Sequence, residues 1–183
     1  MIEYNNELQR LYKPNSIIFI IIVTSKRRDI LIENIEILKF SIANTHKHYN
    51  FNIQAICVMK NHIHLLLAPK NIQEYSKIIL LIKRTFSKRI DINSIIDYEL
   101  KESNIKRKER DIWQRRFWEH TIRDEQDLYR HIDYIHYNSM KHYGIRPKEW
   151  QYSSFKNFVQ KGYYDIDWCN FEDKYNIAKL NLE

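Results

Sequence analysis

Glycine is almost absent from this chain, which has only Gly144 and Gly162 among 183 residues. A Gly-rich loop that would hold nucleotide phosphates is therefore missing, and chemistry of the P-loop type is disfavoured. Cysteine is equally scarce, with only Cys57 and Cys169. Two cysteines give neither a disulfide framework nor a paired-cysteine zinc motif. Cys57 lies in an apolar stretch and is expected to be an inert core thiol.

Long hydrophobic runs are also missing. The apolar stretch 17–23 has seven residues, whereas about 20 are needed to cross a bilayer as a helix. The first 14 residues are polar and do not have the pattern of a signal peptide. We therefore expect a cytoplasmic protein without a membrane partner.

The charge is unbalanced toward the basic side, with 30 Lys and Arg against 23 Asp and Glu and a formal net charge of +7. A hydrophobic content of 44% indicates a globular chain. We expect one domain over 1–183, with the aromatic stretch 145–183 packing on it as an extension. The charge favours a polyanionic partner, most simply nucleic acid, although a lysine-rich surface on any soluble protein would look the same.

Hydrophobic periodicity predicts an alternation of strands and helices. Strands are expected at 16–24, 51–59 and 117–122, and a further strand is expected to begin directly after a Lys60-Asn61 turn. Helices are expected at 32–48, 72–89 and 124–142. The charged stretch 101–110 is expected to be a mobile basic loop. This order predicts an α+β fold, a ferredoxin-like or RRM-like antiparallel sheet with helices on one face, plus a late helix.

Two histidines begin the strand that follows the turn. His62 and His64 are two residues apart, so both imidazoles project from the same face of a strand. A rigid strand is a good platform for two metal ligands, but such histidines can equally be core residues with ordinary hydrogen bonds. A metal site needs at least a third ligand from elsewhere in the chain.

The helix predicted at 124–142 has two distinct faces. Asp124 is a plausible N-cap, and Gly144 ends the helix. Its apolar stripe consists of Leu128, Ile132 and Ile135. A second face carries Tyr134, Asn138 and Lys141, at positions i, i+4 and i+7.

Four stretches together resemble the HUH single-strand transposases and, within them, the REP-associated tyrosine transposases. The stretch 58–67 reads VMKNHIHLLL and is similar to the histidine–hydrophobic–histidine strand of the family. The stretch 112–125 reads IWQRRFWEHTIRDE, and it is followed by HIDYIHYNSMKH at 131–142 and WQYSSF at 150–155. Weaker similarity in the first strand extends the resemblance over nearly the whole chain.

This resemblance implies a role for each matching residue. His62 and His64 would bind a divalent metal, Mg²⁺ or Mn²⁺, with Asn138 as a third ligand, and Tyr134 would be the catalytic nucleophile. The family often has proline after this asparagine, where this chain has Ser139. Tyr137 is a rival nucleophile three residues further along. Because an ordinary tyrosine has a pKa near ~10, the metal or a bound water is expected to help remove its proton.

The implied reaction is cleavage and rejoining of single-stranded DNA hairpins from repetitive palindromic elements, through a 5′-phosphotyrosine. A monomer and a homodimer are both compatible with the sequence. Residues expected to contact DNA phosphates are Lys26, Arg27, Arg28, Lys83, Arg84, Arg115 and Arg116. The alternatives are a hairpin-binding protein with lost or secondary catalysis and, much weaker, a structural zinc protein. We assign the remaining helix and strand histidines a structural or surface role: His120, His131, His136 and His142.

Overall fold

The computed structural model describes residues 16–95, 102–106 and 110–169. At its centre is a four-stranded sheet in the order β2-β3-β1-β4, with every neighbouring pair antiparallel. The strands are β1 (Ile18–Val23), β2 (Phe51–Val58), β3 (His62–Pro69) and β4 (Trp118–Thr121). The predicted α+β class with an antiparallel sheet is confirmed.

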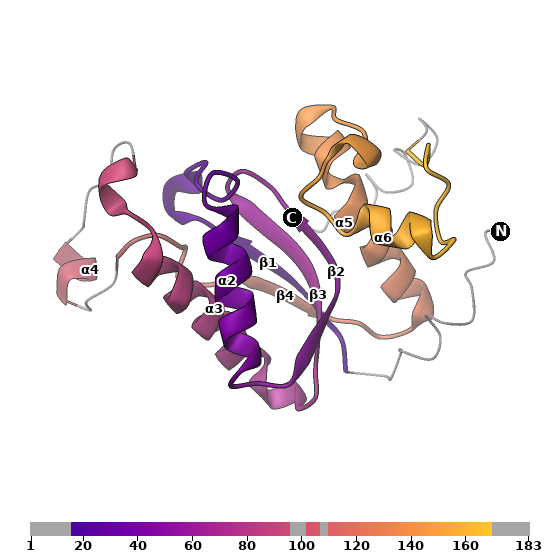
Figure 1. Cartoon of the computed structure of the whole chain (residues 1–183). Helices are drawn as coiled ribbons and strands as arrows, with labels where there is room; N and C mark the ends of the chain where they lie inside the picture. The colour runs from indigo at the N-terminus through magenta and orange to yellow at the C-terminus, as the bar shows by residue number, and fades with distance from the viewer. Residues whose placement is uncertain (1–15, 96–101, 107–109, 170–183) are drawn as a thin grey trace.

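One face of the sheet is covered by α2 (Ile35–His46) and α3 (Tyr75–Arg89), which lie side by side in front of it in Figure 1. Alternate residues of β1 point into this layer, because side chains of a strand alternate between faces. Ile18, Ile20 and Ile22 pack there with the apolar stripe of α3. The short helix α4 (Glu102–Lys106) and the 3-10 turns Ser25–Arg27, Ile72–Glu74, Ile92–Ser94 and Pro147–Glu149 complete the connections described.

The opposite face carries α5 (Glu125–Tyr143) and α6 (Phe155–Gln160), to the right of the sheet in Figure 1. Phe19 and Ile21 of β1 point into this second layer. The predicted helix stripe packs against them, with Leu128, Ile132 and Ile135 all buried. The Asp124 carboxylate caps α5 by accepting from the Asp127 N–H at 2.8 Å, and Gly144 ends the helix with a left-handed φ of 66°.

The segment after α5 closes the outer edge of β2. The Val58 N–H donates to the Tyr152 carbonyl at 2.8 Å, and the Ser154 N–H donates to the Ile56 carbonyl at 2.9 Å. The Trp150 indole N–H reaches the Val58 carbonyl at 3.0 Å. This edge of the sheet is therefore paired, which removes one route to edge-to-edge association.

One expectation drawn from the sequence needs correction. The stretch 101–110 was expected to be a loop, but α4 lies within it, while 107–109 fall outside the described residues. The aromatic C-terminal stretch contains α6, which has too few residues to show a helical period. Phe171 and Tyr175, two aromatic residues of that stretch, lie outside the described residues.

Candidate active site

The two histidines of β3 lie together on the face of the sheet that α5 covers. Their ring centroids are 4.8 Å apart, and the two residues are 3% and 0% exposed for His62 and His64. His62 Nδ1 donates to the Asn61 side-chain oxygen at 2.8 Å, and the Asn61 amide donates in turn to Asp29 at 2.7 Å. This contact leaves the lone pair of His62 on Nε2, the atom that a metal would use.

Helix α5 is fixed at both ends above this pair. Its apolar stripe packs on the sheet, and its last residue, Tyr143, accepts a hydrogen bond from the Lys60 N–H at 3.1 Å. Lys60 belongs to the turn that precedes His62, so the C-terminal end of α5 and the start of β3 are tied together. The helix and the histidine pair come from the same chain.

Tyr134 of α5 places its ring beside that of His64. Its ring lies 5.5 Å from the His64 ring in an edge-to-face arrangement and 5.9 Å from the Phe19 ring. The Lys141 ammonium donates to the Tyr134 hydroxyl at 3.2 Å and lies 5.1 Å from the centre of the same ring. Lys141 follows Tyr134 by seven residues, which is about two helical turns along the same face. A cation at this oxygen stabilises the negative charge that develops when a phenol acts as a nucleophile.

Two α5 residues could supply a third ligand: His142, which lies beside the histidine pair, and Asn138, which lies midway between Tyr134 and His142 along the helix. His142 brings a ring nitrogen within 4.8 Å of nitrogens of both His62 and His64, and its ring is 4.9 Å from that of His62. Asn138 is fully buried and uses its Nδ2 to donate to the Tyr134 carbonyl at 2.7 Å. Its Oδ1 is buried without a hydrogen-bond partner among the described residues. An orphaned buried oxygen is costly, and a cation would satisfy it.

The chemistry of this donor set therefore fits a divalent metal. The sequence predicted His62, His64 and Asn138, but it assigned His142 a structural or surface role and so missed its place beside the pair. One signal was available, because His142 follows Asn138 by four residues and Tyr134 by eight, on nearly the same helix face. Tyr137, the rival nucleophile, belongs to the same buried cluster as Tyr134, and both residues are 2% exposed, so burial does not distinguish the two.

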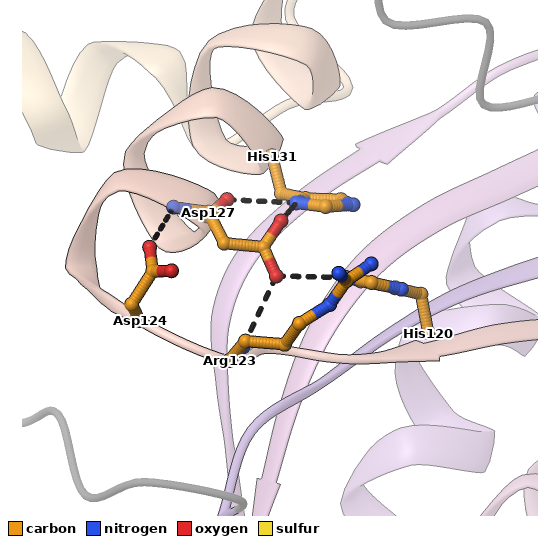
Figure 2. Close-up of polar contacts among 5 residues, drawn as sticks. All are labelled: His120, Arg123, Asp124, Asp127 and His131. Atoms are coloured by element: carbon orange, nitrogen blue, oxygen red, sulfur yellow. Dashed lines mark hydrogen bonds and ion pairs between the residues drawn. The ribbon is translucent and has the colours of Figure 1, made fainter.

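A second cluster lies at the other end of α5 (Figure 2). The Asp127 carboxylate is 2.8 Å from His120 Nε2 and 3.1 Å from His131 Nδ1, and it accepts from the Arg123 N–H at 3.0 Å. His131 Nδ1 also donates to the Asp127 carbonyl at 2.7 Å. These groups lie close enough to hold a metal, but their hydrogen bonds already join β4 to the first turns of α5. Burial lowers the pKa of His131, which keeps this imidazole neutral.

The basic residues predicted to contact DNA fall into two groups. Lys26, Arg27, Arg84, Arg115 and Arg116 are exposed. The first two lie beside the histidine strand, because the Thr24 N–H donates to the Asn61 carbonyl at 2.9 Å. Both have a left-handed backbone, with φ of 54° and 51°, which costs a non-glycine residue roughly 1–2 kcal/mol.

Arg28 and Lys83 have structural contacts instead. The Arg28 side chain is 8% exposed, donates to the Asp111 carbonyl at 2.8 Å and lies 3.5 Å from the Asp111 carboxylate. The Lys83 ammonium donates to the carbonyls of Gln114 and Arg115 at 2.8 and 3.2 Å. Both side chains hold the segment before β4 in place, which a charge count alone does not reveal.

A sequence model of the IS200-like transposases matches residues 13–138, more than half of the chain. The chain belongs to this family.

Individual similar proteins indicate which group of this family the chain resembles. A protein of Haemophilus influenzae, named as a candidate REP-associated tyrosine transposase, is 38% identical over 152 residues, which cover 82% of this chain and 85% of that protein. A REP-associated tyrosine transposase of Escherichia coli is 28% identical over 167 residues, covering 90% and 91%. A solved structure of a REP-associated tyrosine transposase bound to a REP hairpin is 26% identical with a TM-score of 0.68, covering 93% and 92%. The resemblance to this group is confirmed.

The described helices were also compared with the length and hydropathy that a membrane span requires. None of them is both long enough and apolar enough to cross a bilayer.

Proposed function

We propose that this chain cleaves and rejoins hairpin-forming single-stranded DNA through a 5′-phosphotyrosine on Tyr134. One observation carries the proposal: the Tyr134 ring lies 5.5 Å from His64, with its hydroxyl bonded to the Lys141 ammonium. A nucleophile, a cation at its oxygen and a pair of imidazoles thus meet at one place. The relative whose structure was solved with a REP hairpin suggests the kind of DNA.

In the proposed cleavage step, the Tyr134 oxygen attacks phosphorus and gives up its proton. A bond forms between this oxygen and phosphorus, and the bond from phosphorus to the 3′ oxygen of the preceding nucleotide breaks. The departing oxygen takes a proton and becomes a 3′-OH. In the reverse direction a 3′-OH attacks the phosphotyrosine, so strands are rejoined without ATP.

The residues of the chain divide this work. Lys141 orients the phenol and stabilises charge on its oxygen, while the packing of Tyr134 against Phe19 and His64 restricts its motion. His62 and His64, with Asn138 or His142, would hold the metal, Mn²⁺ or Mg²⁺. A divalent ion bound there would supply Lewis-acid polarisation of the scissile phosphate. Lys26 and Arg27, exposed beside the histidine strand, would contact neighbouring phosphates.

The proposal is tested by incubating the full chain with labelled hairpin oligonucleotides and Mn²⁺ or Mg²⁺, and by separating covalent adducts under denaturing conditions. Wild type is expected to form an adduct, and Tyr134→Phe is expected to form none while still binding the hairpin. Tyr137→Phe, three residues along the same helix, is the matched control and should keep the adduct. An adduct that persists in Tyr134→Phe would refute the assignment, and binding without any adduct would favour the hairpin-binding alternative.

A further inference from the structure

Trp118, the first residue of β4, is much more exposed than two other tryptophans of the chain. It is 41% exposed, whereas Trp113 and Trp150 are each 8% exposed. Those two are also hydrogen-bonded through their indole N–H groups, to the carbonyls of Lys83 and Val58. Single exposed rings are common on protein surfaces, so exposure alone assigns no function to Trp118. What distinguishes this ring is where it lies in the sheet.

The sheet register places Trp118 on the same face as the candidate active site. Ile21 of β1 is paired with His64 on one side and with Trp118 on the other. Directly opposed residues of antiparallel strands point to the same face, so the indole and the His64 imidazole are two strand spacings apart, roughly 10 Å. Between them lies Phe19, whose ring is 5.6 Å from Trp118 and 5.9 Å from Tyr134.

The indole is backed by two fixed imidazoles. Trp118 stacks on His120 with an interplanar angle of 18°, and His120 stacks on His131 with an angle of 13° at 4.9 Å. Asp127 lies within hydrogen-bond distance of both imidazoles, as Figure 2 shows. Three nearly parallel rings thus run from the buried His131 to the exposed Trp118. A ring held in this way loses little freedom when a planar ligand stacks on it.

The charges around β4 suit a polyanion. Arg115 and Arg116 precede the strand and Arg123 follows it, and all three residues are exposed. Glu119, within β4, points to the opposite face, where it accepts from the Tyr75 hydroxyl at 2.7 Å. The Arg115 guanidinium donates to the Asn104 side-chain oxygen at 3.0 Å, so Arg116 and Arg123 are the exposed cations that flank the strand on either side of Trp118. An aromatic ring near such cations is a combination that binds single-stranded nucleic acid.

We propose that Trp118 is the stacking platform for one unpaired base of the DNA strand, a role that rests on the function proposed above. Stacked nucleotides rise about 3.4 Å each, so a separation of roughly 10 Å corresponds to about three nucleotides. The base that stacks on Trp118 therefore lies within about three nucleotides of the phosphate attacked by Tyr134. The platform holds the strand beside the site, and it accepts any base because every base has an aromatic face.

The test measures binding of hairpin oligonucleotides with single-stranded flanks to the full chain, in chelator so that no cleavage occurs. Each flanking base is replaced in turn by an abasic site. Trp118→Ala and Trp118→Leu should each weaken binding of the intact oligonucleotide by about fivefold to a hundredfold. Trp118→Phe, which keeps an aromatic face, should retain most of the affinity. Phe40→Ala removes a ring of similar exposure, 40%, from α2 on the other side of the sheet and should bind like wild type.

The decisive result is the coupling between the ring and one base. An abasic site at one position within about three nucleotides of the cleaved phosphate should weaken DNA binding by wild type as much as Trp118→Ala does. The same abasic site should cause no further loss of affinity in Trp118→Ala. Unchanged affinity in Trp118→Leu, or the same loss at every abasic position in both proteins, would overturn the inference and leave the proposed function standing. Failure of wild type to bind any hairpin would refute both. Thermal unfolding of each variant shows whether a loss of binding comes from a loss of folding.

Discussion

Lys141 is the residue whose contact bears most directly on the proposed chemistry, because its ammonium touches the oxygen that would attack phosphorus. We expect Lys141→Met to slow adduct formation at saturating DNA by about a hundredfold, the usual effect of removing one group that stabilises developing charge. Lys141→Arg keeps a cation and should recover part of the rate. The measurement is a single-turnover time course with hairpin DNA. An equal loss of rate in Lys141→Met and Lys141→Arg would show that the positive charge does not determine the rate of adduct formation.

His142 distinguishes two possible ligand sets. If the His142 imidazole is the third ligand, His142→Ala should weaken Mn²⁺ binding by about tenfold or more. If Asn138 is the third ligand beside the histidine pair, the same substitution should leave the Mn²⁺ affinity unchanged. Imidazole ligands also favour Mn²⁺ over Mg²⁺. Titration calorimetry without DNA gives the affinity directly. His48→Ala, which removes an exposed histidine next to the end of α2, is the control, and equal affinities in the two variants would exclude His142 as a ligand.

At the scale of elements, the contact between α5 and α6 contains a buried histidine. His136 Nε2 is 2.7 Å from the Ser154 hydroxyl and Nδ1 is 3.3 Å from the Tyr164 hydroxyl, and the ring packs on Phe158 at 4.7 Å. Burial lowers the pKa of His136 to about 3. The imidazole is therefore neutral in the folded protein at every pH at which the enzyme is expected to work.

This contact predicts a pH dependence of folding. The unfolded chain protonates His136 near its ordinary pKa of about 6.5, while the folded chain does so only near 3. Between these values the unfolded state binds more protons, so stability falls as pH falls, by about 1.4 kcal/mol per pH unit. From pH 6.5 to pH 5 the loss from this residue is about 2 kcal/mol. Urea unfolding measured at pH 6.5 and pH 5 should show this loss in wild type, and the loss should be smaller by about 2 kcal/mol in His136→Gln. The same loss in both proteins would contradict the prediction.

Much of this element-level arrangement could be predicted from the sequence. The strand and helix periods identified β1, β2, β3, β4, α2, α3 and α5, and the Asp124 cap and Gly144 end of α5 are confirmed. These features depend on local patterns. The helix α6 was missed because six residues show less than two turns of periodicity.

Features that depend on tertiary contacts could not be predicted from the sequence. Arg28 and Lys83 look like any other cations in the sequence, but their side chains bond the segment before β4. The nearness of Trp118 to His64 follows from the register of β1 with both neighbours, and the pairing of Ile21 with Trp118 joins residues almost a hundred positions apart. The place of His142 likewise depends on how α5 crosses β3.

At the scale of the whole molecule, the proposed nucleophile and the histidine pair belong to one chain. Tyr134 meets His64 of its own sheet, and Tyr143 is bonded to the turn that begins β3. We therefore expect no complementation between two defective proteins. A mixture of Tyr134→Phe with a His62→Ala and His64→Ala double variant should form no more adduct than either protein alone. Recovery of adduct in the mixture would mean that α5 serves a partner chain.

A single-chain site also sets the stoichiometry of the proposed reaction. With Tyr134 as the proposed nucleophile, each molecule would have one nucleophile within its own site, so after one cut it would stay covalently joined to the 5′ end that it made. Product should appear as a burst whose amplitude counts active molecules, and the burst per molecule should not change on dilution as long as the DNA remains in excess. The protein would then act as a stoichiometric carrier of one DNA end, released only when a 3′-OH returns to the phosphotyrosine.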